Sequence, residues 1–327
     1  MEQRTFPRLG RQAGVVGLGA WQLGADWGTV SEDDAMAVLS AAVEAGVNFL
    51  DTADVYGDGR SEQLIGRFRA ARPDATLTVA TKMGRRVPQT PEAYTLDNFR
   101  KWTDRSRANL GVDTLDLVQL HCPPTVVFAD DAVFDALDTL VDEKRIAAYG
   151  VSVETCDEAL TAIARPAVAS VQIILNALRH KPLERVLPAA ASAGVGIIAR
   201  VPLASGLLSG RYDEHTTFAA DDHRSYNRHG EAFDVGETFS GVDFSTGLAA
   251  VRRLAPLVGT DRTMAQFALR WVLDQPGVTV VIPGARDAAQ ARANVAAAGQ
   301  PPLSTSELTE VTAVYDELIR PQVHHRW

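Results

Sequence analysis

The sequence predicts a (β/α)8 barrel, an α/β fold of eight parallel strands enclosed by helices, built as a single domain over residues 1–327. Eight short apolar runs alternate with amphipathic stretches along the chain. The runs are almost continuously apolar, as expected for parallel strands buried on both faces. Nothing resembling a Gly/Ser linker, a charge block or a low-complexity tract divides the chain.

The strands are expected at the eight apolar runs, residues 15–20, 47–50, 77–80, 115–120, 146–151, 170–175, 195–199 and 278–282. Between the first two runs, Ser31 followed by three acidic residues is typical of a helix N-terminus. Gly46 and Gly194 each end a helical stretch just before a strand, at positions where a positive φ is easily adopted. The polar segment 211–242 after the seventh strand is too long for an ordinary connection, which favours a lid or binding loop.

An open, doubly wound sheet is the alternative fold. Such a sheet would carry a G-x-G-x-x-G phosphate-binding turn after its first strand. Here Gly17-Leu18-Gly19 is followed by Ala20, Trp21 and Gln22, so the third glycine is missing. The barrel is therefore favoured.

Composition excludes several classes of protein. The chain of 327 residues has 32 Lys and Arg against 41 Asp and Glu, a net charge of −9, and a pI near 5.3, which disfavours nucleic-acid binding. No apolar run is long enough to span a membrane, and the first residues lack a secretory signal. Cys122 and Cys156 form neither a disulfide framework nor a zinc motif. We therefore expect a soluble cytoplasmic enzyme.

Polar side chains follow most of the predicted strands. Barrel enzymes carry their chemistry at the C-terminal ends of the strands, so these side chains should converge on one mouth. They are Asp51, Lys82, His121, Ser152, Arg200 and Arg286, together with Gln172 inside the sixth run. Each alone has a structural explanation, such as a turn cap or a solvated side chain, but the set is less easily explained that way.

Four of these positions suit carbonyl reduction. Reduction needs a hydride donor and an acid that protonates the developing alkoxide, and Tyr56 is a candidate acid. Lys82 would lower the pKa of the phenol, and Asp51 would keep the ammonium charged and oriented. His121 would hold the carbonyl oxygen.

The motifs around these residues resemble those of the aldo-keto reductase superfamily, in the branch of potassium-channel beta subunits and bacterial general stress proteins. The matching segments are Leu50-Asp51-Thr52-Ala53-Asp54-Val55-Tyr56-Gly57, Ala80-Thr81-Lys82, Asp116-Leu117-Val118-Gln119-Leu120-His121, Gly150-Val151-Ser152, Val171-Gln172, Pro202-Leu203-Ala204-Ser205-Gly206 and Ile282-Pro283-Gly284. They occur in order along nearly the whole chain. The resemblance implies the barrel, Tyr56 as general acid, and Asp51, Lys82 and His121 as its catalytic partners.

The resemblance also implies NADP(H) bound across the barrel mouth, with NAD(H) as the alternative cofactor. Ser152 and Gln172 would hold the nicotinamide amide, and Asp51 with the backbone at Ala20 and Trp21 would line its ribose. The residues implied for the pyrophosphate are Pro202, Leu203, Ser205 and Arg211. The residues implied for the adenosine end and its 2′-phosphate are Gly284, Arg286, Gln290 and Asn294, beside a helix start that favours anions.

Three positions depart from the common pattern of the superfamily. Val153 stands where an Asn often follows the amide-binding Ser, and Gln290 stands where NADP-preferring members often have a basic residue. Arg286 is expected to supply the phosphate contact instead. Arg200 replaces an aromatic residue that stacks on the nicotinamide, and its charge should disfavour the oxidised, cationic ring.

Substrate contacts are assigned from the expected loops. Trp27, Val55 and Phe128 should rim the mouth, and Arg224 and Tyr226 belong to the long polar loop. His215, His223 and His229 in that loop fit no metal-binding spacing, so no metal site is expected.

The leading interpretation is an NADPH-dependent reductase of aldehydes or ketones, including sugar carbonyls. One alternative is a cofactor-binding accessory subunit with slow catalysis, a role known in the superfamily. Another is an aldolase that uses Lys82 as a Schiff base, which would require a lowered lysine pKa. The expected partner is a small carbonyl compound; the sequence does not indicate an oligomeric state.

Overall fold

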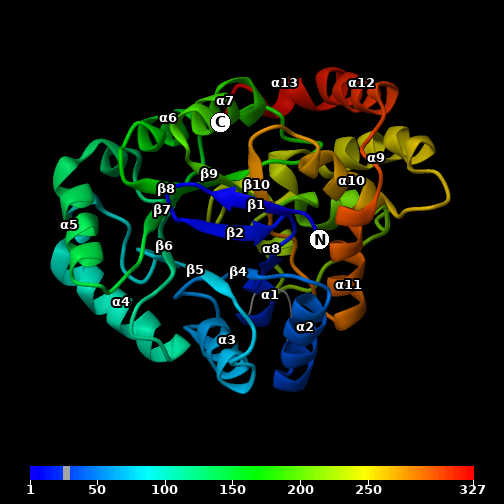
Figure 1. Cartoon of the computed structure of the whole chain (residues 1–327). Coiled ribbons are helices and arrows are strands. Elements are labelled where there is room, and N and C mark those ends of the chain that lie inside the picture. The colour runs from blue at the N-terminus through cyan, green and yellow to red at the C-terminus, as the bar shows by residue number, and fades with distance from the viewer. Residues whose placement is uncertain (25–29) are drawn as a thin grey trace.

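Eight parallel strands form a barrel in the computed structural model, which describes residues 1–24 and 30–327 (Figure 1). In chain order the strands are β3 (Leu18–Gly19), β4 (Phe49–Asp51), β5 (Thr78–Met83), β6 (Leu117–His121), β7 (Tyr149–Ser152), β8 (Val168–Ile174), β9 (Gly196–Arg200) and β10 (Val278–Val281). Each strand pairs in parallel with the next. Parallel bridges from Val16 to Val281 and from Gly19 to Gly284 join the last strand to the first. The predicted barrel is confirmed.

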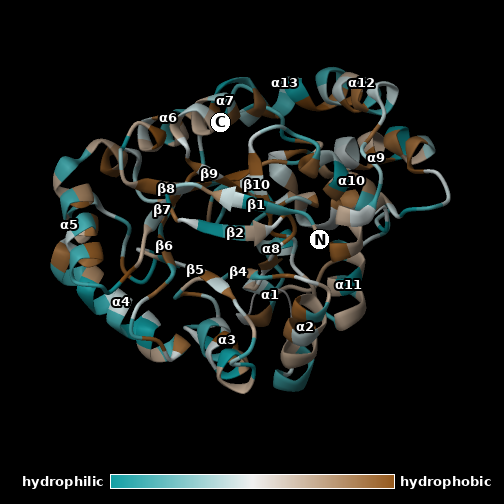
Figure 2. Cartoon of the chain, in the orientation of Figure 1, coloured by the Kyte–Doolittle hydropathy of each residue, from teal (hydrophilic) through white to brown (hydrophobic). Residues whose placement is uncertain are grey.

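Helices cover the outside of the barrel (Figure 1). The longer ones are α2 (Glu32–Glu44), α3 (Arg60–Ala71), α4 (Leu96–Leu110), α5 (Asp131–Asp142), α6 (Cys156–Ile163), α7 (Pro182–Ala193), α9 (Phe244–Val258), α10 (Met264–Leu273), α11 (Ala288–Ala296) and α12 (Thr305–Val314). Helix α2 begins as predicted, because the Ser31 hydroxyl accepts a hydrogen bond of 3.1 Å from the Asp34 amide. Figure 2 shows hydrophilic and hydrophobic residues mixed on these helices, as expected for elements with one buried face.

A hairpin that the sequence reasoning missed lies across one end of the barrel (Figure 1). It consists of the antiparallel strands β1 (Gln3–Phe6) and β2 (Arg11–Gly14). Phe6 is fully buried and stacks on Phe49 at 5.4 Å between ring centroids, within a cluster that includes Ala80 and Ile198 from the barrel strands. The hairpin therefore closes the end that holds the strand N-termini, and the opposite end remains for a site.

The first barrel strand is shorter than predicted. The apolar run 15–20 contributes only the two residues of β3, although the backbone before it remains paired: Val15 O accepts from Val281 N at 2.9 Å. The segment 211–242 is the predicted long connection after β9. It contains one short helix, α8 (His223–Tyr226), and two 3-10 turns, η4 (Val235–Glu237) and η5 (Phe239–Gly241).

Within the described residues, no helix combines the length and apolar character that crossing a membrane requires.

Candidate active site

Asp51, Lys82 and Tyr56 meet at the C-terminal ends of β4 and β5. The Lys82 Nζ atom lies 2.5 Å from Asp51 Oδ1, 2.8 Å from the Thr52 carbonyl oxygen and 3.2 Å from the Tyr56 hydroxyl. Lys82 is buried, with a side chain only 1% exposed. Burial alone would lower the pKa of Lys82, but the Asp51 carboxylate and Tyr56 raise it above its usual value, so the side chain remains an ammonium.

Tyr56 is held by a close approach of two backbone segments. A Cβ added at Gly24, in the short helix α1 (Trp21–Gly24), would lie 2.6 Å from the Tyr56 carbonyl carbon. Gly57 takes a φ of +59°, which a side chain would disfavour. The Tyr56 ring also stacks on Trp21, with 5.9 Å between centroids. These contacts fix the phenol over Lys82.

The pKa of Tyr56 is raised, whereas the sequence analysis predicts that Lys82 lowers it. Burial raises the pKa of the phenol above its usual 10, and the Lys82 ammonium only partly opposes this effect. The desolvation of the ring, which a sequence does not show, outweighs the effect of the cation. Tyr56 is therefore a neutral phenol at pH 7 and carries the proton that a general acid must donate.

His121 ends β6 and meets the Tyr56 ring edge-on, with 6.0 Å between centroids. Burial, reinforced by the positive charges of Arg85, Lys82 and Arg200, holds the pKa of His121 well below its usual 6.5. Its buried Nδ1 has no hydrogen-bond partner among the described residues. We therefore assign the proton of the neutral ring to Nε2, because a buried N–H without an acceptor costs more than a free lone pair.

Two amides hold the second oxygen of Asp51. Gln172 Nε2 donates to Asp51 Oδ2 at 2.7 Å, and Gln119 Nε2 donates to the same oxygen at 3.2 Å. Sequence reasoning missed Gln119. It lies two residues before His121 on the same strand, and alternate strand residues share a face, so this signal was available.

A second acid, Asp54, is fully buried close to the same lysine, and neither of its carboxylate oxygens has a hydrogen-bond partner in the described chain. Burial raises the pKa of Asp54 to about 7, with a further contribution from the nearby Glu62. Asp51 and Asp54 are therefore two buried acids in contrasting environments, one paired and one not.

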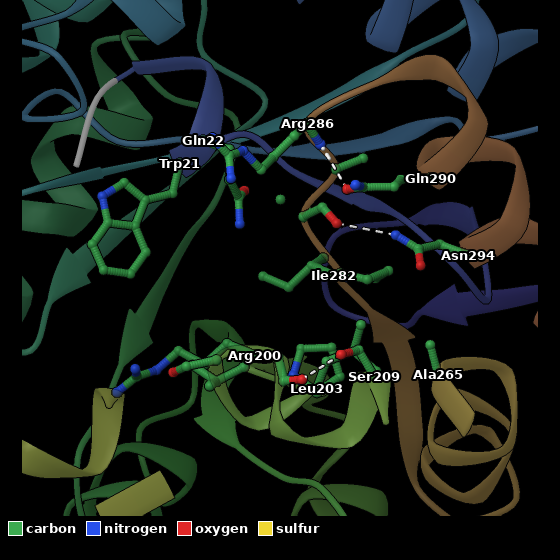
Figure 3. A pocket seen from close by; sticks show the side chains of 18 of the residues that line it. Trp21, Gln22, Arg200, Leu203, Ser209, Ala265, Ile282, Arg286, Gln290 and Asn294 are labelled. Atoms are coloured by element: carbon green, nitrogen blue, oxygen red, sulfur yellow. Dashed lines mark hydrogen bonds between the residues drawn. The ribbon is translucent and has the colours of Figure 1, made fainter. Parts of the chain in front are cut away.

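A cavity of about 630 Å³ opens at this end of the barrel. Tyr56, Asp51 and His121 line it, whereas Lys82 lies behind them. The cavity is also lined by most of the residues expected at the cofactor, namely Trp21, Ser152, Gln172, Arg200, Pro202, Leu203, Ser205, Arg211, Gly284, Arg286, Gln290 and Asn294. Figure 3 shows Arg200, Leu203 and Ser209 on one side of it and Arg286, Gln290 and Asn294 on the other.

Ala20 is placed differently from its expected neighbours. It is fully buried and does not line the cavity, although its amide donates to the Asp51 carbonyl oxygen at 2.8 Å. Its place at the cavity is taken by Gln22, a residue that sequence reasoning did not select. The Gln22 side chain lies against Gly284, where an added Cβ would be 2.0 Å from Gln22 Oε1.

The backbone after β9 has an unusual conformation. Val201, Ala204 and Ser205 have φ values of +52°, +47° and +54°, and non-glycine residues rarely adopt such angles. Strained backbone of this kind clusters at functional sites, and alternating right- and left-handed residues can direct amides at an anion. The Ser205 hydroxyl is already used, because it donates to Glu237 O and accepts from Phe239 N. A ligand would therefore contact Ser205 through its backbone and not through its hydroxyl.

The other end of the cavity is formed by the start of α11. Asp287 caps this helix and accepts from the Gln290 amide at 2.8 Å. Gln290 Oε1 accepts from the Arg286 amide, and Asn294 Nδ2 donates to the Gly284 carbonyl oxygen at 3.0 Å. Gln290 and Asn294 thus hold the turn, and the exposed Arg286 is the cation available to a ligand there.

Arg200 is not a solitary charge. Its Nη2 lies 2.8 Å from Glu154 Oε2, and its Nη1 lies 3.6 Å from Glu237 Oε1. The effect expected for Arg200 considers its charge alone, and the structure adds two carboxylates that offset this charge. Sequence reasoning missed both acids. Glu154 lies two residues after Ser152, whereas Glu237 is brought in by the long loop and has no local signal.

The expected substrate residues do not form one group. Arg224 lines the cavity, whereas Val55 and Tyr226 are not among its described lining residues. Phe128 was expected at the mouth, but this is wrong: it is fully buried in the core, because the 3-10 turn η2 (Thr125–Ala129) directs it inward. Trp27 lies outside the described residues.

Comparison with known proteins gives consistent relatives. The Aldo/keto reductase family matches residues 15–316. Aldo-keto reductase YhdN of Bacillus subtilis is 28% identical over 90% of this chain and 87% of its own length. D-threo-aldose 1-dehydrogenase of Pseudomonas sp is 33% identical over 61% of this chain and 70% of its own. A probable voltage-gated potassium channel subunit beta of Arabidopsis thaliana is 26% identical over 93% of each chain.

Solved structures agree on the fold. The glycerol dehydrogenase AKR11B4 from Gluconobacter oxydans superposes with a TM-score of 0.78 at 29% identity, covering 98% of this chain and 96% of its own. An aldo/keto reductase from Klebsiella pneumoniae, solved with NADP and acetate, has a TM-score of 0.71 at 21% identity and covers 96% of both chains. The chain therefore belongs to the aldo/keto reductase family of oxidoreductases.

Proposed function

We propose that this protein reduces an aldehyde or ketone to the alcohol, with NADPH as the hydride donor and Tyr56 as the general acid. The observation that carries the proposal is the contact of 3.2 Å between Lys82 Nζ and the Tyr56 hydroxyl, beside Asp51 and at the wall of the cavity. An acid with its own buried cation is suited to giving up a proton during the reaction.

The roles of the side chains follow from their charges. Tyr56, neutral at pH 7, donates its proton to the carbonyl oxygen as the carbon is reduced. Lys82 remains an ammonium because of Asp51, so it stabilises the phenolate that is left behind. His121 remains a neutral imidazole and donates from Nε2 to the same carbonyl oxygen. Solvent then returns a proton to Tyr56.

The residues along the cavity fit a dinucleotide. When bound, NADPH would supply the hydride to the carbonyl carbon. Ser152 and Gln172 would hold its amide, the strained backbone at 201–206 its pyrophosphate, and Arg286 its 2′-phosphate. The Klebsiella pneumoniae structure with NADP shares this fold. NADPH is preferred in the proposal because Arg286 is exposed at the adenosine end, and NADH remains the alternative.

Two features support a small, hydroxylated carbonyl compound, including a sugar, as substrate. The wall of the cavity carries the charged residues Arg200, Glu237 and Arg224, and a polar wall of this kind suits a substrate with hydroxyl groups better than an apolar one. One relative is a D-threo-aldose 1-dehydrogenase. Arg224 is the proposed substrate contact from the long loop.

An aldolase and an accessory subunit are the two alternatives to the reductase. An aldolase Schiff base needs a lysine with a lowered pKa, whereas Asp51 and Tyr56 raise the pKa of Lys82. An accessory subunit with slow catalysis remains the second candidate, because a potassium channel beta subunit is among the relatives.

The test is consumption of NADPH, and of NADH in parallel, with a panel of aliphatic aldehydes, aromatic aldehydes, ketones and aldoses. Turnover that is faster with NADPH and highest for the hydroxylated members is expected. Borohydride trapping of Lys82 with a carbonyl substrate would instead indicate the aldolase. Tight NADPH binding without turnover of any member would contradict the reductase and favour the accessory role.

A further inference from the structure

A buried network of charged residues surrounds Arg200 at the end of β9. Besides Glu154 and Glu237, Arg200 contacts the carbonyl oxygen of Val153, to which its Nη2 donates at 3.1 Å. The Arg200 side chain is only 8% exposed, yet the residue lines the same cavity as Tyr56. Its charge therefore lies beside the site and is poorly screened by water.

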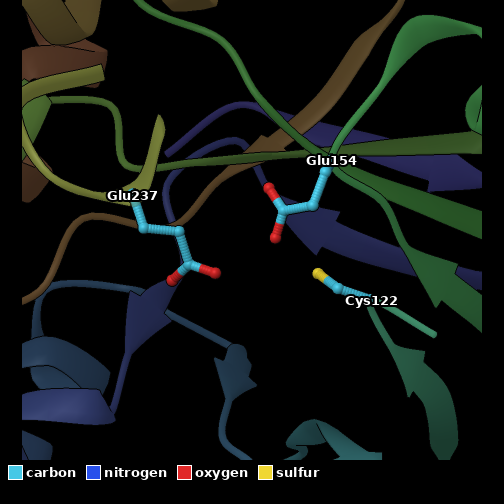
Figure 4. A group of neighbouring side chains, drawn as sticks. All are labelled: Cys122, Glu154 and Glu237. Atoms are coloured by element: carbon cyan, nitrogen blue, oxygen red, sulfur yellow. The ribbon is translucent and has the colours of Figure 1, made fainter. Parts of the chain in front are cut away.

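A second arginine shares both carboxylates. Arg85 Nη2 lies 3.4 Å from Glu237 Oε1 and 3.6 Å from Glu154 Oε1. The two carboxylates and the Cys122 thiol face one another in Figure 4. One carboxylate oxygen of each acid and the thiol sulfur all lie within 4.8 Å of one another. Burial raises the pKa of Cys122 to about 12, so the thiol remains neutral. Glu237 is held ionised by the two arginines, so above the pKa of Glu154, which is raised to about 7, the two guanidinium groups and the two carboxylates leave the network with no net charge.

We propose that Glu154 and Glu237 neutralise Arg200 at the nicotinamide subsite, and that this neutralisation sets the relative affinity of the site for oxidised and reduced cofactor. The inference rests on the proposed function, because it needs a nicotinamide ring beside Arg200. Glu154 and Glu237 are positioning residues in this account, since they act through Arg200.

The physical reason is the charge of the ring. The nicotinamide of NADP⁺ carries a positive charge, and that of NADPH is neutral. An unpaired guanidinium at this wall would repel the oxidised ring alone, and the repulsion would be strong because the site is partly buried. The paired Arg200 exerts little net repulsion. Loss of one carboxylate would leave an excess positive charge and weaken NADP⁺ binding selectively.

Glu154 is the better carboxylate to remove. Its side chain lies 2.8 Å from Arg200, whereas that of Glu237 lies 3.6 Å away. Glu154→Gln retains the shape of the side chain and removes only its charge. Burial, partly opposed by Arg200, raises the pKa of Glu154 to about 7. Binding should therefore be measured at pH 8, where wild-type Glu154 is mostly ionised.

The experiment measures the dissociation constants of NADP⁺ and NADPH by fluorescence titration. The variants are Glu154→Gln, Arg200→Gln and the double variant. Glu143→Gln is the matched control, because Glu143 also pairs with two arginines, Arg100 and Arg145, but on the outer surface. The ratio of the two constants reports on ring charge, and the shared 2′-phosphate cancels from it.

We expect Glu154→Gln to raise the ratio of the NADP⁺ constant to the NADPH constant by about ten-fold. The double variant removes one charge of each sign, so its ratio should return to within about two-fold of the wild type. Arg200→Gln alone should lower the ratio, and Glu143→Gln should leave it unchanged. A Glu154→Gln protein that binds both forms with the wild-type ratio would overturn the inference. A wild-type protein that binds neither form would refute the proposed function, and the inference with it.

Discussion

Replacement of Asp51 by Asn should destabilise the fold far more than the same change at Asp54. Both side chains are acids buried near Lys82, but their environments are opposite. Asp51 accepts hydrogen bonds from Lys82, Gln119 and Gln172, whereas Asp54 has no hydrogen-bond partner in the described chain. The pair of variants therefore separates the effect of a buried ion pair from the effect of burial.

The magnitude for Asp51→Asn follows from the ion pair. Removing one partner of a buried pair costs about 3–5 kcal/mol, because the other charge is left without compensation. The Asn amide group would also meet a donor, either Lys82 or a glutamine. An unfolding entropy of about 2.1 cal/mol/K per residue gives roughly 0.7 kcal/mol/K for 327 residues. The expected loss is then about 4–7 °C in Tm.

The difference in stability between Asp54→Asn and the wild type should depend on pH. The folded-state pKa of Asp54 is about 7, above the reference value of 3.8, so the folded protein retains a proton that the unfolded chain has released. Stability is therefore lost as the pH rises from about 4 to about 7. The Asn variant avoids this loss, so its Tm should match the wild type near pH 4.5 and exceed it at pH 8.

Thermal unfolding followed by far-UV circular dichroism at both pH values checks the two predictions together. Equal Tm losses for Asp51→Asn and Asp54→Asn would refute the reasoning, since burial alone would then explain both. A Tm gain for Asp54→Asn that does not grow between pH 4.5 and pH 8 would show that Asp54 is ionised in the folded state.

Three further predictions concern the cofactor and the titratable groups. Arg286→Ala should weaken NADPH binding by about ten-fold and leave NADH binding unchanged, with Arg292→Ala, in the helix that follows Arg286, as control. Equal losses for both cofactors would contradict the phosphate contact. The His121 ring should not titrate near pH 6.5 in NMR spectra assigned by comparison with His121→Asn, because burial lowers its pKa; a midpoint at 6.5 would contradict the neutral imidazole. Burial raises the pKa of Cys122 to about 12 and that of Cys156 to about 11. Mass spectrometry should therefore show that both thiols resist iodoacetamide at pH 7.5 until the protein is unfolded. Rapid labelling of the folded chain would contradict these pKa values.

The sequence predicts the barrel because the burial of each strand, and the alternation of strands and helices along the chain, are visible in the local pattern of residues. Continuous apolar runs marked the strands, and the rule that polar groups follow them led to Asp51, Lys82 and His121. The same rule applied two residues earlier would have found Gln119, which shares a face of β6 with His121. Glu154 lies two residues beyond Ser152, just past the end of β7. Residues within one strand or its immediate end could thus be read from the chain.

The remaining features depend on contacts between distant segments. Glu237 reaches Arg200 because the long loop folds back over β9, and nothing in the sequence near Glu237 indicates this contact. Phe128 was misplaced because a residue after a strand can turn either to the mouth or to the core, and packing decides. The direction of the Tyr56 pKa also depended on burial, which is a property of the folded site.

Turnover by Tyr56→Phe tests the central claim most directly. The variant retains the ring and its stacking on Trp21, and it removes only the hydroxyl beside Lys82. Loss of the acid should lower kcat by about 10²–10⁴-fold, while the dissociation constant of NADPH remains within about two-fold of the wild type. Tyr94→Phe, a buried tyrosine whose hydroxyl contacts Gln89, is the matched control and should retain kcat. A Tyr56→Phe enzyme with wild-type kcat would contradict the assignment of Tyr56 as the general acid.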